Sequence, residues 1–111
     1  MRLYVAGPMS GLPDHNYPAF HEAARKLRAA GYTVLNPAEN GRPPGDPWQA
    51  FMRDAIALLI QCDAVALLDG WQNSRGAVIE QNLAKNLGMT RWPTNHWLIE
   101  AGTNPYERCV S

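Results

Sequence analysis

The sequence is poor in cysteine, has no excess charge of either sign and contains no long hydrophobic run. Its 111 residues include two cysteines, Cys62 and Cys109, which lie far apart and form no CxxC or Cys/His cluster. Neither a disulfide framework nor a zinc site is therefore expected. Ten basic and ten acidic residues give a formal net charge of zero, and because the basic residues are scattered, no nucleic-acid or membrane surface is predicted. The lack of a signal-peptide pattern and of an apolar run of about 18 residues favours a soluble, cytoplasmic protein.

Two common nucleotide-binding motifs are also absent. Residues 3–6 predict a short strand, and the turn GPMSG at residues 7–11 follows it at once, where α/β folds place ligands. The turn is not GxGxxG, and the chain contains no GxxxxGK, so neither the dinucleotide fingerprint nor the P-loop applies. On its own, the Gly-Pro turn indicates no more than a tight connection.

What the sequence does contain is an alternation of strand and helix patterns. Apolar residues at helical spacing predict helices over residues 17–30 and 48–62 and a third after Ser74. Short apolar runs predict strands at residues 3–6, 32–35, 63–68 and 89–92. Because β-α-β units are parallel and right-handed, the pattern predicts one doubly wound, flavodoxin- or Rossmann-like α/β domain over residues 1–111. It would have a parallel sheet of four or five strands, flanking helices and a site at the carboxyl ends of the strands.

Two segments fit more than one description. The loop at residues 36–47 is rich in glycine and proline and long for a compact domain, which is compatible with a functional loop or a surface connection. The tail at residues 93–111 has no clear period. Its WLI run at residues 97–99 fits a fifth, edge strand, but also a dimer contact or an arm.

The segment DGWQNSRGAVIEQNLAKNLG, at residues 69–88, is the most informative. Ser74 suits the N-cap of the helix that follows, because its hydroxyl can accept a hydrogen bond from the first turn. Free N–H groups at that end, including that of Gly76, can bind an anion. Glu80 shares a helix face with four apolar residues, Ala77, Leu83, Ala84 and Leu87. Such a carboxylate is either a partnered structural residue or a catalytic one, and the spacing alone slightly favours the structural role.

A second carboxylate, Asp54, lies beside the apolar stripe of the preceding helix, three residues after Phe51 and four before Leu58. An Asp in such a position is usually bonded to a neighbouring loop. The histidines are predicted to be surface residues. Two carboxylates and an anion site suit cleavage of a glycosidic bond in a phosphorylated substrate, where one attacks the anomeric carbon and the other manages the leaving group's proton. From the residues alone, this is one option among several.

Four segments follow one another along the chain: LYVAGPMSG, the helix with Asp54, the strand DAVALL and the segment SRGAVIEQNLAKNLG. As an ordered set, they resemble the nucleoside 2-deoxyribosyltransferase-like superfamily. That superfamily includes 2′-deoxynucleoside 5′-monophosphate N-glycosidases, and the resemblance covers about residues 3–88. It implies that Glu80 is the nucleophile, which forms a glycosyl-enzyme intermediate at C1′. It also implies that the Tyr4 hydroxyl orients this carboxylate and that Asp54 assists departure of the base.

The resemblance implies a phosphate site as well. Transferases that act on free nucleosides carry Asp six residues before the nucleophile, bonded to the sugar 5′-hydroxyl, whereas monophosphate hydrolases carry Ser there. This chain has Ser74, and an Asp in its place would repel a phosphate dianion. Arg75 and Gly76 follow as further phosphate-binding residues. The turn after the first strand would supply backbone N–H groups to phosphate and sugar, from Gly7, Met9, Ser10 and Gly11.

The predicted function is therefore hydrolysis of the base–sugar bond in a nucleoside or deoxynucleoside 5′-monophosphate, with net retention and without a metal or other cofactor. Two alternatives stay open, namely base exchange by a nucleoside 2-deoxyribosyltransferase and a catalytically silent nucleotide-binding module. Because relatives are homodimers or larger, the resemblance also implies a homo-oligomer, in which Trp92, Trp97 and the tail would form the contact.

Overall fold

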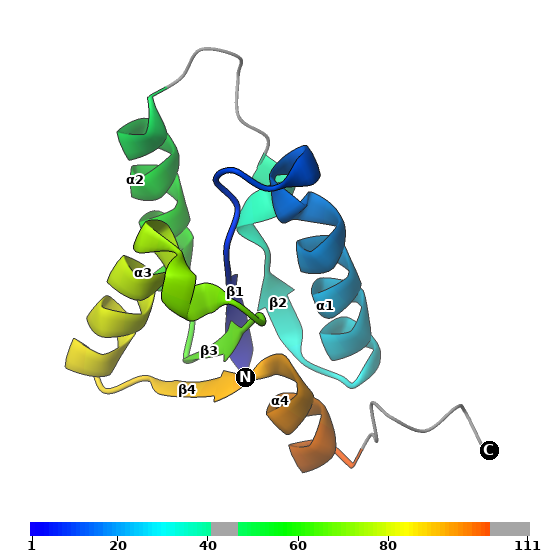
Figure 1. The fold of residues 1–111 in the computed structure, drawn as a ribbon. Coiled ribbons are helices and arrows are strands. Elements are labelled where there is room, and N and C mark those ends of the chain that lie inside the picture. The colour runs from blue at the N-terminus through cyan, green and yellow to red at the C-terminus, as the bar shows by residue number, and fades with distance from the viewer. Residues whose placement is uncertain (41–46, 103–111) are drawn as a thin grey trace.

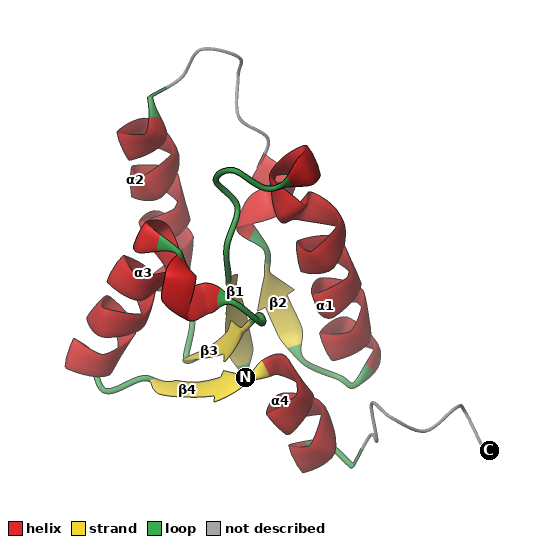
Figure 2. Cartoon of the chain, viewed as in Figure 1, coloured by secondary structure: helices red, strands yellow, loops and turns green. Residues whose placement is uncertain are grey.

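The computed structural model describes residues 1–40 and 47–102 and has a parallel sheet with helices on both faces (Figure 1, Figure 2). The strand order is β2-β1-β3-β4, and all three pairings are parallel. The strands span Arg2–Ala6 (β1), Thr33–Leu35 (β2), Ala64–Leu67 (β3) and Thr90–Pro93 (β4). The predicted α/β fold with four strands is confirmed.

Two helices cover each face of the sheet (Figure 1). α1 (Tyr17–Ala29) and α4 (Thr94–Glu100) pack on one face, and α2 (Trp48–Leu59) and α3 (Arg75–Asn86) pack on the other. Short 3-10 turns lie at Pro13–Asn16, Pro37–Asn40 and Trp71–Asn73. Among the residues that the structure describes, no helix combines the length and the apolar character needed to cross a membrane.

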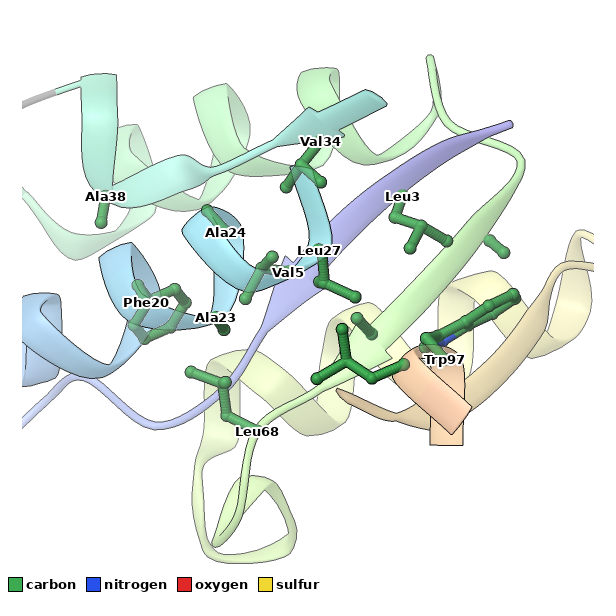
Figure 3. Close-up of a cluster of buried hydrophobic side chains, with 13 residues drawn as sticks. Leu3, Val5, Phe20, Ala23, Ala24, Leu27, Val34, Ala38, Leu68 and Trp97 are labelled. Carbon is green, nitrogen blue, oxygen red and sulfur yellow. The ribbon is translucent and has the colours of Figure 1, made fainter. Parts of the chain in front are cut away.

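Residues of β1 alternate between the two faces, since successive side chains of a strand point to opposite sides. Leu3 and Val5 enter the core beneath α1 and α4, where they join Phe20 and Trp97 (Figure 3). Tyr4 enters the other core, beneath α2 and α3. All four residues of β3 are buried, as expected for a central parallel strand. The alternation thus places the Tyr4 ring on the α2/α3 face.

Of the alternatives that residues 97–99 fit, the fifth, edge strand is wrong, because these residues belong to α4. The Trp97 indole is buried, and its Nε1 donates a hydrogen bond to the Val65 carbonyl at 2.9 Å. The Tyr32 hydroxyl donates to the Trp97 carbonyl, also at 2.9 Å. Bulky residues in succession are typical of strands, but here these long-range contacts favour a helix that returns over the sheet. Residues 103–111 of the tail lie outside the described residues, and the dimer contact stays a prediction.

The loops after β1 and β3 meet at the carboxyl edge of the sheet. From β1 the chain proceeds to β2 on one side and later to β3 and β4 on the other, so these loops flank the switch point, where open α/β sheets bind ligands. The N–H of Leu68 donates to the Ala6 carbonyl at 2.8 Å, which extends the pairing past the strand ends. Figure 1 shows the N-terminal ends of α1, α2 and α3 at this same edge.

Gly7 is required by the close approach of these two loops. A Cβ atom at position 7 would lie 2.7 Å from the Cβ of Leu68, so the backbone would have to shift. We expect Gly7→Ala to lower the free energy of unfolding in urea by about 1–3 kcal/mol, as overpacking does. Gly76→Ala is the matched control, because the nearest atom to its Cβ would be the flexible Met52 Sδ at 3.1 Å, with the other neighbours at ordinary contact distances. Its stability should stay within about 1 kcal/mol of wild type, and equal losses in both variants would contradict this explanation.

Candidate active site

A buried tyrosine–glutamate pair lies between β1 and α3. The Tyr4 hydroxyl donates a hydrogen bond to Oε2 of Glu80. Tyr4 is completely buried and Glu80 is 5% exposed, and no other charged side chain of the described residues is buried. The structure therefore brings together the two residues that the resemblance pairs, while their catalytic roles stay a prediction.

The period of α3 sends Glu80 into the core. The buried residues of α3 are Ala77, Glu80 and Ala84, which share one face by their spacing of three and four, as predicted. The small alanine side chains on either side allow the helix to approach the sheet, and the longer glutamate reaches Tyr4. Leu87 does not belong to this face. It is 54% exposed, because α3 ends one residue earlier and Leu87 is its C-cap.

Burial changes the ionisation of both groups. Loss of solvation raises the pKa of Glu80 from 4.5 to about 7, and the hydrogen bond from Tyr4 opposes this rise by favouring the charged form. The pKa of Tyr4 is raised well above 10.0, first by burial and then by the charge of Glu80. Near neutral pH, both ionisation states of Glu80 are therefore accessible, while Tyr4 keeps its proton and remains a donor. A carboxyl group with such a pKa is typical of acid–base or nucleophilic catalysis.

The N-terminus of α3 is built as predicted. Ser74 is the N-cap, and its Oγ accepts a hydrogen bond from the Ala77 N–H at 3.2 Å. The Ser74 carbonyl accepts from the Val78 N–H at 2.9 Å. Helix geometry directs the N–H groups of Arg75 and Gly76 out of the helix end. This end of α3, six residues before Glu80, is thus suited to an anion.

The four predicted ligand-binding residues of the turn after β1 differ in exposure. Gly7 is buried, and Met9 is half-buried and packs against the core beneath α1. Ser10 and Gly11 are exposed. Gly11 has a φ of +79°, a left-handed conformation that favours glycine. Ser10 and Gly11 are therefore the most exposed residues of this turn.

Asn16 occupies the N-cap position of α1, but its side chain braces this turn and does not cap the helix. It has a φ of 60° and forms no side-chain cap hydrogen bond. Instead, its Nδ2 donates to the Pro8 carbonyl at 2.9 Å. The contact spans eight residues of irregular loop, which is why local capping rules did not identify it.

Asp54 lies on the exposed side of α2, whose buried residues are Met52, Ala55 and Leu59. Across residues 1–40 and 47–102 it forms no hydrogen bond or ion pair, so the bond to a neighbouring loop expected from its position is not found there. Its assistance to the departing base stays a prediction.

The three histidines are exposed, as predicted, at positions 15, 21 and 96. The Nδ1 atom of His21 lies 3.3 Å from the Asn36 amide nitrogen, and the ring of His96 lies 4.2 Å from that of Trp92. In the part of the chain that the structure describes, no three His, Cys, Asp or Glu side chains gather as metal ligands.

Trp48 is a residue of this edge that sequence reasoning missed. The Cζ of Arg75 lies 4.6 Å from the centroid of the Trp48 ring. Trp48 is the first residue of α2 and Arg75 the first of α3. The position of Trp48 at the start of a predicted helix could have identified it, because a doubly wound fold gathers the N-terminal ends of its helices at the carboxyl edge of the sheet.

A family model described as a domain of unknown function (DUF4406) matches residues 1–91, which include every candidate site residue. The chain belongs to the DUF4406 family. No curated protein matches this DUF4406 chain.

Among solved structures, the DUF4406 chain is similar to a 2-deoxyribosyltransferase from the psychrotolerant bacterium Bacillus psychrosaccharolyticus. The TM-score is 0.65 at 19% sequence identity, over 82% of this chain and 69% of that one. That enzyme is described as a biocatalyst for the synthesis of antiviral and antitumoral nucleosides. At this identity the similarity shows a common fold, which is the fold that the resemblance implied.

Proposed function

We propose that this DUF4406 protein hydrolyses the base–sugar bond of a nucleoside or deoxynucleoside 5′-monophosphate, with Glu80 as the nucleophile. The observation that carries the proposal is the buried Tyr4–Glu80 pair beneath the carboxyl edge of the sheet. A buried carboxylate is destabilising unless it is well paired. Within the described residues Glu80 forms no ion pair. The fold shared with a 2-deoxyribosyltransferase supports chemistry at C1′.

Tyr4 holds one carboxylate oxygen of Glu80 and leaves the other, Oε1, to attack. As the C1′–N bond breaks, its electron pair passes to the base and Oε1 bonds to C1′ through an oxocarbenium-like transition state. Asp54 supplies the proton that the base requires. Water then attacks C1′ from the face that the base has left and returns a proton to Asp54. Glu80 is released, and the configuration at C1′ is retained.

The 5′-phosphate is bound by Ser74, Arg75 and the N–H groups of the first turn of α3 in this proposal. Glu80 lies six positions after Ser74, which corresponds to about 9 Å along the helix axis. This spacing leaves room for a sugar between the phosphate and the nucleophile. Ser10 and Gly11 flank the sugar from the turn after β1.

Ser74→Asp is expected to lower kcat/KM for 5′-monophosphates by about tenfold or more, while the corresponding nucleosides are affected less. Asp also caps helices, so the fold is kept, but its charge repels a phosphate dianion. Ser74→Asn is the matched control, since it caps without charge. Initial rates of base release for each nucleotide and its nucleoside measure the effect. An equal loss for both substrates would contradict the phosphate site.

Tyr4→Phe is expected to move the pH dependence of base release upward by about one to two pH units, as loss of a hydrogen bond to a charged group does. Wild-type kcat/KM should rise with pH through about 7 as Glu80 ionises. Without the hydroxyl, the hydrogen bond that lowers the pKa of Glu80 is lost and burial still raises it. Tyr32→Phe, whose hydroxyl contacts the Trp97 carbonyl instead, is the control. An unchanged midpoint in Tyr4→Phe would exclude the orienting role.

The proposed function is tested by a chromatographic screen for free base. Ribo- and deoxynucleoside 5′-monophosphates, including modified pyrimidines, are incubated with the protein, with and without an added second base. Release of base without an acceptor supports the hydrolase. A new nucleotide formed only with the added base supports a transferase, the second candidate, which the solved 2-deoxyribosyltransferase favours. A rise in melting temperature with a nucleotide but no base release would overturn both and favour a binding module.

A further inference from the structure

We propose that Trp48 is a positioning residue, which fixes the guanidinium of Arg75 for contact with the 5′-phosphate. The inference rests on the function proposed above and adds a determinant of its substrate class. α2 and α3 lie side by side on one face of the sheet (Figure 1). The guanidinium carbon of Arg75 lies 4.6 Å from the centroid of the Trp48 ring, which is cation–π geometry.

The charge of Arg75 has no partner of opposite sign in residues 1–40 and 47–102. Arg28 shows the contrast, because its guanidinium contacts both carboxylate oxygens of Glu39, at 2.7 and 2.9 Å, and donates to the Val34 carbonyl at 2.8 Å. The donors of Arg28 are thus engaged within the protein. Within residues 1–40 and 47–102, no side-chain hydrogen bond or ion pair engages the donors of Arg75.

The Trp48 indole lies beside the first turn of α3, where it packs near Gly76. A Cβ atom on Gly76 would lie 3.1 Å from the Met52 Sδ and 3.6 Å from Cζ2 of Trp48. The first turn of α3 thus packs closely on Trp48 and Met52 of α2. Trp48 is half-buried while Arg75 is exposed, so a packed ring supports a side chain that faces solvent.

A stacked guanidinium is well suited to a phosphate. Its plane is fixed by the ring, and its N–H donors can then contact two phosphate oxygens at once. Because fewer rotamers of Arg75 must be given up on binding, affinity for the anion increases. An uncharged nucleoside gains nothing from this arrangement, so the Trp48–Arg75 pair favours nucleotides over nucleosides.

Inorganic phosphate is the probe for the test, because its binding requires no catalysis. Phosphate is titrated into the full chain, and the Nε–H signal of Arg75 is followed in proton–nitrogen NMR spectra. Trp48→Leu is expected to weaken phosphate binding roughly two- to fivefold, the range of an exposed cation–π contact. Trp48→Phe keeps an aromatic face and is expected to remain close to wild type. In the Arg75→Gln background, where binding is followed at the backbone N–H of residue 75, Trp48→Leu is expected to cause no further loss.

The double-substitution arm decides whether Trp48 acts through Arg75. Equal weakening by Trp48→Leu in the wild-type and Arg75→Gln backgrounds would overturn the inference, as would the absence of any phosphate binding in wild type. Coupled phosphate binding with no base release from any nucleotide would overturn the N-glycosidase and leave this inference standing. Base release together with phosphate binding that is independent of Trp48 would support the N-glycosidase and overturn the positioning role of Trp48.

Discussion

Glu80→Gln is expected to lower the rate of base release by about 10³-fold or more, the scale on which loss of a nucleophile acts. Glutamine keeps the size of the side chain and an oxygen that can accept from Tyr4. It has no carboxylate oxygen with which to attack C1′. The variant should still bind nucleotide, since the predicted phosphate residues are unchanged.

Steady-state release of base from the best substrate measures this loss, and the nucleotide-induced rise in melting temperature reports binding. Glu100→Gln is the matched control, because Glu100 lies on α4 with its side chain 62% exposed, and it should keep full activity. Wild-type rates in Glu80→Gln would exclude Glu80 as the nucleophile. Loss of binding together with activity would instead assign it a structural role.

The same substitution is expected to stabilise the protein at alkaline pH. Glu80 has a pKa of about 7 in the folded protein and 4.5 as the ordinary value. Below pH 4.5 the group is protonated in both states and has no effect. Between pH 4.5 and 7 the unfolded chain gives up its proton first, so folding stability falls as pH rises, and above pH 7 the full penalty of a buried charge remains.

This penalty is roughly 3–4 kcal/mol, at about 1.4 kcal/mol for each pKa unit. Glu80→Gln removes it, so urea unfolding should show the variant more stable by that order at pH 8 and nearly equal to wild type at pH 4. Glu22→Gln is the control, because a hydrogen bond from Arg25 lowers the pKa of Glu22, and no stabilisation at pH 8 is expected there. A difference for Glu80→Gln that does not change with pH would contradict the raised pKa.

These two expectations belong together. A side chain whose removal would increase stability and abolish activity is typical of a functional site, where stability and activity conflict. Burial that raises the pKa of Glu80 also removes water from around its carboxylate. Burial of the Glu80 carboxylate thus weakens the fold and would also make the nucleophile reactive.

Local patterns predicted the parts of this molecule that depend on neighbours in the sequence. The cap at Ser74 follows from its hydroxyl and the helix that begins after it, and the buried position of Glu80 follows from the helical period. The alternation of strands and helices was sufficient to predict the parallel sheet, since short connections leave few other arrangements.

Contacts between distant segments could not be predicted in this way. The sequence left a strand, a dimer contact or an arm open at residues 97–99, and the Trp97 indole lies in a helix, where it bonds to Val65, 32 residues earlier. Asn16 stands at the N-cap position of α1, but its side chain donates to the Pro8 carbonyl and not to the helix. The stacking of Arg75 on Trp48 depends on how two helices pack. In each case tertiary contact overrides a local preference that points elsewhere.

Two successive inversions at C1′ are the signature of a covalent bond to Glu80. The most direct measurement is therefore the anomeric configuration of the product when methanol competes with water, followed by proton NMR with the nucleotide found in the screen. Attack by Glu80 and then by methanol is expected to give a methyl glycoside with the β configuration of the substrate. The α-anomer, or a mixture of both, would contradict a glycosyl-enzyme intermediate on Glu80.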